Sequence, residues 1–542
     1  MRKIALAFLL LSPLFCDFQQ DLQMELSPKT PPKKIADWMM RKQIIKNEDI
    51  QPPTNKKKIK LTIKEVVYST LHHQWDIQIA RKIVEEQKGQ WQQSKGAFNP
   101  LIDLGAEKKW LLDAQQLGFK TTENGHATKL LLSLTKQIPL GTRFSFQADT
   151  ERIMDPSNSF DYTNQSKLSF FIQQPLFKSL KYNEANVARK VDYLELKALR
   201  SQLYHTISFQ IFETLSLYWD LVAFKQLHRI NRSSYHILSL LTKNTEKLIE
   251  GGFVAKAEIN KQMAELLRQK KAAINSQQLV YESYNLILFE MGKPKETFDN
   301  NPPDLELQEF PPLYTDKEKW SLEHLLQLAL ESREDLKAAT IRLEETEWQL
   351  RFAKNQMLPT FDLQLGVNVK NNEVDERARP FFAPFENGPF QKDIVCGFRF
   401  SIPLFNDAAK GQRTKRRSQN LQAVLEKNRL LESIRTEIAN SYRNQMELID
   451  EVVLASEAVE WYKQALKDEI KRRKEGHSTF FIVIDAEENL RNTLIEKTLV
   501  QNRLAKNSQE LLFLTGQLVS VGQEEMVNIH LNFNPLIKKD EK

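Results

Sequence analysis

The chain has 542 residues, of which 41% are hydrophobic, 27% are charged and only 16 are glycine. This composition favours long helices over an all-β enzyme, and the length is enough for several domains. The net charge of +7 is spread along the chain, with no basic face interleaved with aromatic residues, which argues against nucleic-acid binding.

The first 16 residues have the form of an export signal. Positive charge at Arg2 and Lys3 precedes a mostly apolar run at 4–15 that is too short to span a bilayer as a helix. Cys16 ends the run and leaves lipid attachment open, although Pro13-Leu14-Phe15 fit a lipid-attachment motif poorly. We therefore predict a signal peptide at 1–16, followed by a flexible, polar and proline-bearing leader at 17–58.

Beyond Cys16 the sequence contains no run of about 18 apolar residues. The mature chain is therefore expected either to be soluble or to cross a membrane as a β-barrel. The only other cysteine is Cys396, so no disulfide is expected within a mature chain that has lost or lipidated Cys16.

A first unit at 59–292 is predicted to open with two helices. Thr62 is the candidate N-cap of the first and Asp76 that of the second, which Pro100 brings to an end. Segments with strand-like alternation follow at 101–110, 130–137, 143–149 and 167–173. Their spacing leaves open whether this unit supplies two strands or four.

A second unit at 320–516 repeats this plan. The pairs Asp76/Asp335, Pro100/Pro359 and Leu104/Leu363 share a constant offset of 259 residues. Alternating segments at 361–369 and 394–402 have the length of transmembrane strands. We therefore predict two tandem repeats joined by a linker at 293–319, with a tail at 517–542 that shows little pattern.

Each unit contains one very long helical pattern, at 183–250 and 408–475. A helix of about 68 residues is roughly 100 Å long and needs coiled-coil partners along its length. The returning helices, at 254–291 and 479–515, are about half as long. Stacked end to end with the 23-residue helices that open each unit (76–98 and 335–357), they would match the long ones in a paired rod.

The long and returning helices meet at two similar tips. Gly252 and Gly476 lie 224 residues apart, and the glycines that end the returning helices, Gly292 and Gly516, have the same offset. Glycine takes a left-handed conformation cheaply and is a natural stop for the incoming helix. After Gly476, Ser478 or Thr479 is expected to cap the next helix.

No pattern points to an enzyme. The acid pair Glu487-Glu488 occupies adjacent helical positions that face different ways. The pair His72-His73 has no other histidine or cysteine at ligand spacing, so we expect no metal site there. The sequence also has no glycine-rich phosphate loop and no nucleophile motif, so we expect no cofactor.

The order of these motifs over about 60–516 resembles the TolC-like outer-membrane efflux protein family. The resemblance depends on the Leu358-Pro359 type of helix end, the strand-to-helix phrases Gln174-Pro-Leu-Phe and Ile402-Pro-Leu-Phe, and the glycine tips, all occurring in order and twice. It implies a mainly α fold with a transmembrane β-barrel, in which three chains share one β-barrel and a periplasmic α-barrel.

The resemblance also implies a location and partners. Such a homotrimer lies in outer-membrane lipid and extends into the periplasm, where its tips meet an adaptor (membrane fusion) protein coupled to an inner-membrane transporter. Four strands per chain give twelve in a trimer, whereas six per chain would give eighteen and depart from the usual family pattern.

Family likeness suggests a gate at the periplasmic entrance. Glu258 and Asp485 stand where the family carries acidic residues that form a ring at the constriction, although Ile482 occupies a position where some members carry a second acid. Arg473 stands where the family often has a tyrosine that links neighbouring helices. An Arg473–Glu258 link that holds the closed state is the expectation, against the alternative that both are solvated helix-end charges.

The tips themselves are the expected adaptor-docking surface, because contiguous exposed apolar residues mark partner sites. This surface comprises Gly252, Phe253, Val254, Gly476, Ser478, Thr479, Phe480 and Phe481. The function expected is the exit duct of a tripartite efflux pump or type I secretion system, with the cargo unspecified by the sequence. The alternative is a soluble periplasmic coiled-coil structural protein whose β segments form a small sandwich.

Overall fold

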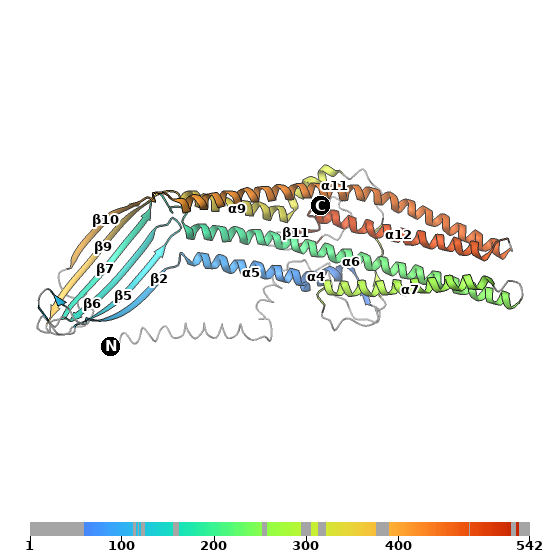
Figure 1. Cartoon of the computed structure of the whole chain (residues 1–542), viewed down its shortest axis with the longest axis horizontal. Helices are drawn as coiled ribbons and strands as arrows, with labels where there is room; N and C mark the ends of the chain where they lie inside the picture. The colour runs from blue at the N-terminus through green and yellow to red at the C-terminus, as the bar shows by residue number, and fades with distance from the viewer. Residues whose placement is uncertain are drawn as a thin grey trace, which may run out of the picture.

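The computed structural model describes residues 59–111, 115–116, 119–120, 125–154, 162–251, 257–293, 305–312, 321–375, 390–475, 477–521 and 527–529. The molecule is elongated, with a curved sheet at one end and paired helices running from it to two tips at the other (Figure 1). The signal peptide and leader predicted at 1–58 lie outside the described residues. No helix in the described part is both long and apolar enough to cross a membrane.

Two long helices form the backbone of the rod. Helix α6 spans Glu184–Glu250 and α11 spans Asp407–Lys474, with 67 and 68 residues. Along α6 pack α5 (Trp75–Gly96) towards the sheet and α7 (Ala257–Glu290) towards the tip. Helices α9 (Glu334–Asn355) and α12 (Phe480–Leu514) pack along α11 in the same way (Figure 1). The expected rod, with one continuous helix beside two stacked ones, is confirmed.

The helix starts differ in detail from the sequence prediction. Thr62 does cap α4 (Ile63–His73), with the reciprocal bonds of a capping box to Glu65. The prediction of Asp76 as the next N-cap is wrong, because the side chain of Gln74 accepts the bond from the Ile77 amide and α5 begins at Trp75. Asp76 lies in the first turn, where a carboxylate still suits the helix dipole.

Both returning helices end at a glycine that contacts the end of a short helix. Gly292 has φ +64°, and a Cβ there would lie 2.1 Å from the carbonyl oxygen of His73, at the end of α4. Gly516 has φ +69°, and its Cβ would lie 3.0 Å from the backbone of Ser332, at the end of α8 (Leu322–Ser332). At both places the left-handed backbone and the close approach require glycine.

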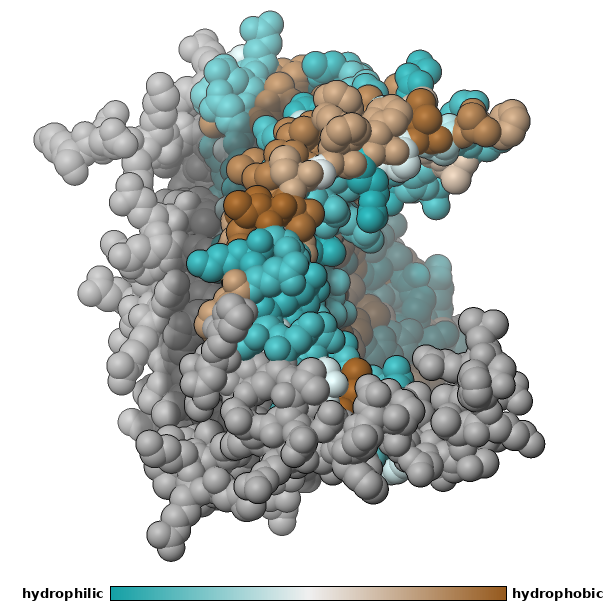
Figure 2. Space-filling view, turned by 90° about the vertical axis from the view of Figure 1, so that its left-hand side faces the viewer, coloured by the Kyte–Doolittle hydropathy of each residue, from teal (hydrophilic) through white to brown (hydrophobic). Residues whose placement is uncertain are grey.

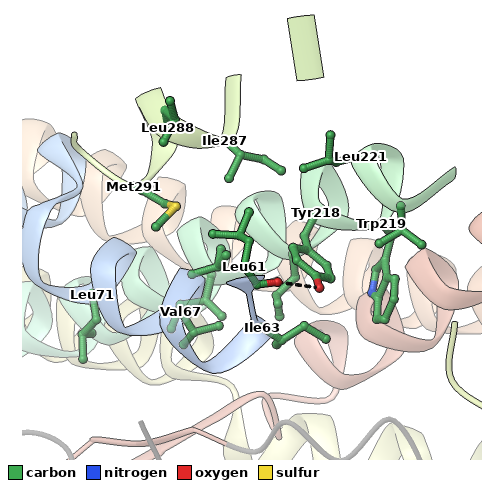
Figure 3. Packing of buried hydrophobic residues seen from close by; sticks show 14 of the residues in the cluster. Leu61, Ile63, Val67, Leu71, Tyr218, Trp219, Leu221, Ile287, Leu288 and Met291 are labelled. Atoms are coloured by element: carbon green, nitrogen blue, oxygen red, sulfur yellow. Dashed lines mark hydrogen bonds between the residues drawn. The ribbon is translucent and has the colours of Figure 1, made fainter. Parts of the chain in front are cut away.

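The largest hydrophobic core lies in the middle of the rod, where α4, α6 and α7 meet (Figure 3). The predicted linker takes part, because β8 (Leu305–Leu307) pairs in parallel with β1 (Ile59–Leu61). The predicted tail contains a small hairpin that the sequence did not reveal, β11 (Val519–Val521) with β12 (Val527–Ile529). These short elements cover the core and tie the linker and tail to the rod.

A buried tyrosine joins this core to the linker. The Tyr218 hydroxyl donates to the carbonyl oxygen of Leu61, 3.0 Å away, and accepts from the Gln308 amide at 3.0 Å (Figure 3). Burial raises the pKa of the Tyr218 phenol to about 12. The hydroxyl therefore remains protonated and able to donate well above neutral pH.

Replacing Tyr218 with phenylalanine is expected to lower the free energy of unfolding by about 1–3 kcal/mol, since the Leu61 carbonyl and Gln308 amide lose a buried partner. Because the pKa is raised in the folded state, the bond is fully present below about 10 and is lost as pH rises through about 12. Denaturant titration of both proteins at neutral pH measures the loss. Equal midpoints would contradict it.

The sheet contains six of the described strands in the order β10-β9-β7-β6-β5-β2, all antiparallel. The strands are β2 (Leu101–Leu111), β5 (Gly125–Gln137), β6 (Arg143–Met154), β7 (Tyr162–Pro175), β9 (Thr360–Asp375) and β10 (Gln391–Ser401). All four strand-like segments of 101–173 lie in this sheet, which resolves the choice between two and four strands in favour of four. Pairing of β7 with β9 joins the two halves of the chain.

The two faces of the sheet have opposite character. One row of Cα partners across all six strands is apolar: Ile102, Leu134, Phe146, Phe170, Val367 and Ile394. The adjacent row on the other face is polar: Asp103, Ser133, Gln147, Ser169, Asn368 and Asp393. Seen from the sheet end, hydrophobic side chains gather towards the top of the view, where β9 and β10 lie (Figure 2). Ile394 and Phe398 are 84% and 75% exposed.

Candidate functional site: the tips and the seam between the helical hairpins

The second tip is formed by a short connection between α11 and α12. Helix α11 ends at Lys474, and the amide of His477 donates back to the carbonyl oxygen of Arg472 at 2.9 Å. Thr479 occupies the N-cap position of α12, but its side chain makes no capping bond, and the Ser478 hydroxyl donates to the Glu469 carboxylate. The expectation that Ser478 or Thr479 caps α12 with its side chain is therefore wrong: Thr479 holds the N-cap position without a capping bond, and Ser478 is bonded to α11.

The apolar side chains of this tip are less exposed than expected. Phe480 is only 5% exposed and lies beneath the guanidinium of Arg473, whose carbon is 4.6 Å from the ring centroid. The Phe481 ring is partly buried, with the Lys261 ammonium 4.4 Å from its centroid. The expectation that Phe480 is exposed is wrong for this chain, and Ile482, at 50%, is the exposed apolar side chain here.

The remaining predicted residues are placed in part. Gly252, Phe253, Val254 and Gly476 lie outside the described residues, and Glu258 lies in the first turn of α7 with no described side chain. Asp485 is exposed on α12 and accepts from the amide of Asn489 at 3.2 Å. The Arg473–Glu258 link therefore stays a prediction.

A second ionic cluster, which the sequence analysis missed, joins the two hairpins. Arg268 of α7 donates to Glu265, one turn before it, and to Glu488 of α12, both at 2.7 Å. Arg491 of α12 mirrors it, with Glu488 at 3.2 Å and Glu265 at 4.0 Å. We call these four residues the inter-hairpin cluster. Its sequence signal is a Glu-x-Leu-Arg phrase that occurs once after each tip, at 265–268 and 488–491.

The cluster is only partly open to solvent. The side chain of Arg491 is 8% exposed and that of Glu265 is 17% exposed. Burial alone would raise the pKa of Glu265, but the bonds from Arg268 and Gln269 and the charge of Arg491 outweigh it and lower the pKa. The carboxylate is therefore held in its charged form. The four charged side chains form two connected ion pairs, and because they are partly buried, dissolved salt weakens them less than it weakens an ion pair on the surface.

Next to the cluster, the contact surface between the two hairpins, which we call the seam, contains buried polar side chains, and some of their polar atoms have no hydrogen-bond partner. Glu487 is 5% exposed, and burial raises the pKa of its carboxyl group. A hydrogen bond from Ser234 and the charge of Arg491 oppose this rise in part. Among the described residues, both polar atoms of the Gln262 side-chain amide are buried with no hydrogen-bond partner. Buried polar groups without partners cost free energy, so this seam is held together less firmly than an apolar one.

The comparisons with known proteins agree with this architecture. Residues 325–517 match the family model described as outer membrane efflux protein. None of the curated proteins matches the sequence. The fold is similar to the outer membrane protein VceC of Vibrio cholerae, with 17% identity over 84% of this chain and 96% of that one and a TM-score of 0.61.

Other solved outer-membrane channels have the same fold. The CmeC channel of Campylobacter jejuni is 14% identical over 86% of this chain and 90% of that one, with a TM-score of 0.64. The open state of the MtrE channel of Neisseria gonorrhoeae is 11% identical over 86% and 94%, with a TM-score of 0.59. The matches extend over both halves of this chain, whereas the family model covers mainly the second.

Proposed function

We propose that three copies of this protein form one exit duct of an efflux pump or type I secretion system, because residues 325–517 match the outer membrane efflux protein model and most of the chain has the fold of outer-membrane channels. The protein is in the outer membrane and extends into the periplasm. Its neighbours in fold and family are channel proteins, which argues against an enzyme.

The strongest support for this proposal is the combination of a two-faced sheet with long paired helices. A sheet with one apolar and one polar face stands at the end of paired helices that are about 100 Å long. An apolar outer band and a polar interior are what a membrane channel requires, whereas a soluble sandwich would bury the apolar face. Two tandem repeats, at 59–292 and 320–516, would each contribute a helix pair, strands and a helical hairpin.

The first experiment is to fractionate the membranes and measure the native mass in mild detergent. An outer-membrane trimer of about three times 63.3 kDa that conducts ions in planar bilayers is the expected result. A soluble monomer or dimer would remove the channel and leave the coiled-coil structural protein as the better interpretation.

At the periplasmic end, the tips would dock to an adaptor protein coupled to an inner-membrane transporter. The support is the exposed Ile482 and the partly exposed Phe481 beside the tip, together with the family match. Gly252, Phe253, Val254, Gly476, Ser478, Thr479 and Phe480 would complete this surface. Ser478 and Phe480 would act by shaping the tip, because both contact α11.

A closed state held by Arg473 and Glu258 predicts that Arg473→Ala raises the leak conductance of the trimer. The same change removes the cation above the Phe480 ring, so the tip also loses a contact worth about 0.5–1 kcal/mol. Conductance of single trimers at low voltage measures the leak. Unchanged conductance would contradict the gate at Arg473 and leave the inter-hairpin cluster as the candidate.

The inter-hairpin cluster would also stabilise the closed state of this entrance, to a degree that depends on pH. The pKa of Glu265 is lower in the folded state than its ordinary value of about 4.5. The charged carboxylate therefore stabilises the cluster fully above about pH 4.5, and this stabilisation is lost as pH falls through the lower folded-state pKa. Leak conductance is therefore expected to stay low at neutral pH and to rise below pH 4.5. In Glu265→Gln the leak should already be raised at pH 7 and respond less to acid.

A further inference from the structure

Four of the six strands in the sheet continue directly from or into a helix. Strand β2 follows α5, β7 leads into α6, β9 follows α9 and β10 leads into α11 (Figure 1). Strands β5 and β6 have no helix of their own, because a tight turn at 138–142 joins them at the helical end of the sheet. Helices α5 and α6 are neighbours, yet two strands, β5 and β6, lie between their strands β2 and β7.

The turn of this β5–β6 hairpin is fixed to the start of α6. The amide nitrogen of Asn183 donates to the carbonyl oxygen of Pro139 at 2.7 Å, while its oxygen caps α6 by accepting from the Asn186 amide. The Thr142 hydroxyl donates to Gln174 of β7. Gly141 has φ +81°, and a Cβ there would lie 2.5 Å from the Ser179 carbonyl oxygen. These specific contacts fix the turn against α6 and β7, so the β5–β6 hairpin is an integral part of the sheet.

Both faces of the sheet pass through the hairpin without interruption. Leu134 and Phe146 continue the apolar row between Ile102 of β2 and Phe170 of β7. Ser133 and Gln147 continue the polar row in the same way. A hairpin that plugged the duct or lay outside it would have no reason to keep this alternation in register with its neighbours.

The outermost strands of the sheet each pair on one side only among the described strands. They are β2 and β10, of 11 residues each, and they run in opposite directions because every pairing between them is antiparallel. Within a bilayer such an edge must find a partner. A second copy offers the matching edge, with an antiparallel sense and the same apolar and polar rows.

We propose that β10 of each copy pairs with β2 of the next, so that three copies close a barrel of eighteen strands to which the β5–β6 hairpin contributes one strand in three. This proposal rests on the trimeric duct proposed above. With strands about 4.8 Å apart and tilted by about 40°, eighteen give a backbone diameter of about 36 Å, against about 24 Å for twelve.

This width fits the helical part of the same duct. At the sheet end each chain has four described helices, α5, α6, α9 and α11. Twelve helices about 9 Å apart have a circumference of about 110 Å. Eighteen tilted strands have about the same circumference, whereas twelve have about 75 Å. With the β5–β6 hairpin in the sheet, the barrel would therefore be about as wide as the ring of helices that leads into it. The barrel would then pass any hydrophilic cargo that the tips admit.

The native cysteine on β10 allows a test of the closure between copies. Cys396 is exposed and shares its face with Ile102, Leu104 and Ala106 of β2. Within one chain, four strands separate the two edges, about 20 Å or more, which is beyond disulfide reach. Each of the three β2 residues is changed to cysteine singly in the full-length protein, and the trimer is oxidised in outer-membrane vesicles.

At least one variant is expected to form covalent dimers and trimers on a denaturing gel, and adding Cys396→Ser should abolish them. For the strand order, the double variants Leu104→Cys/Leu132→Cys and Ala148→Cys/Leu168→Cys join Cα partners of β2–β5 and β6–β7. In a Cys396→Ser background both should form intrachain disulfides in the native trimer. Electron cryomicroscopy of the trimer should then count eighteen strands.

A trimer that conducts but has twelve strands, with no β2–β5 disulfide, would overturn this proposal and leave the channel intact. Absence of all three cross-links to Cys396 in a trimer that forms both intrachain disulfides would overturn the edge pairing. A monomer without conductance would instead overturn the proposed function itself.

Discussion

Replacing Phe146 with lysine is expected to prevent stable insertion of the proposed trimer into the outer membrane. Phe146 lies in the apolar row on β6, paired with Leu134 and Phe170, and its side chain is 37% exposed in the single chain. A lysine on the lipid face of a membrane sheet costs about 2–4 kcal/mol at mid-membrane depth, and the trimer would carry three of them. The measurement is the fraction of protein recovered as trimer from outer membranes.

The neighbouring residue supplies the control. Ser145 precedes Phe146 on the same strand, and its Cα partners on the polar face are Thr135 and Phe171. Lysine at Ser145 is expected to cost less than about 1 kcal/mol, because it would face the water-filled interior and not lipid. Equal recovery of the two lysine variants would show that β6 does not face the bilayer.

Replacing Arg491 with alanine is expected to give the largest increase in leak at the periplasmic end. Arg491 is nearly buried and serves two carboxylates, Glu488 at 3.2 Å and Glu265 at 4.0 Å. Its loss leaves these charges, together with the buried Glu487, partly uncompensated. If this loss destabilises the closed contact between the hairpins by about 2–3 kcal/mol, the ratio of open to closed trimers would rise by roughly 30- to 150-fold.

Arg503 on the same helix is the matched control. It pairs with Glu451 of α11 at 3.0 Å, within one hairpin and not between the two, and both side chains are exposed. Arg503→Ala is expected to leave the leak within about twofold of the unchanged protein, since exposed pairs contribute little. Single-trimer conductance distinguishes the two, and a rise in both variants would show that any loss of charge on α12 opens the duct.

Much of the fold could be predicted because the signals are periodic and long. The two helices of 67 and 68 residues, the returning helices and the four strand segments of 101–173 all follow from apolar spacing and from glycine or proline at their ends. Exact ends were less predictable. Gln74 caps α5 in place of Asp76 because its side chain reaches the Ile77 amide, a choice that local sequence does not reveal.

The candidate site was harder to predict because its residues come together only through packing of the two hairpins. Glu265 and Arg491 are 226 positions apart in sequence, and each has a partner on its own helix, so single-helix spacing explains them without any contact between hairpins. Phe480 was misjudged for a more local reason: it is 5% exposed, and Arg473, seven positions earlier in the same tip, lies over its ring only after the chain has turned.

The pairing of β7 with β9 limits how early the sheet can be completed during export and folding. Residues 162–175 can find this partner only after 360–375 have been synthesised and exported, so any sheet that the first four strands form before then has an unpaired β7 edge beside an apolar face. Such a sheet is prone to aggregation, so we expect a periplasmic escort that shields exposed strand edges to assist biogenesis. A chain truncated before Thr360 should accumulate as a protease-sensitive intermediate bound to such an escort.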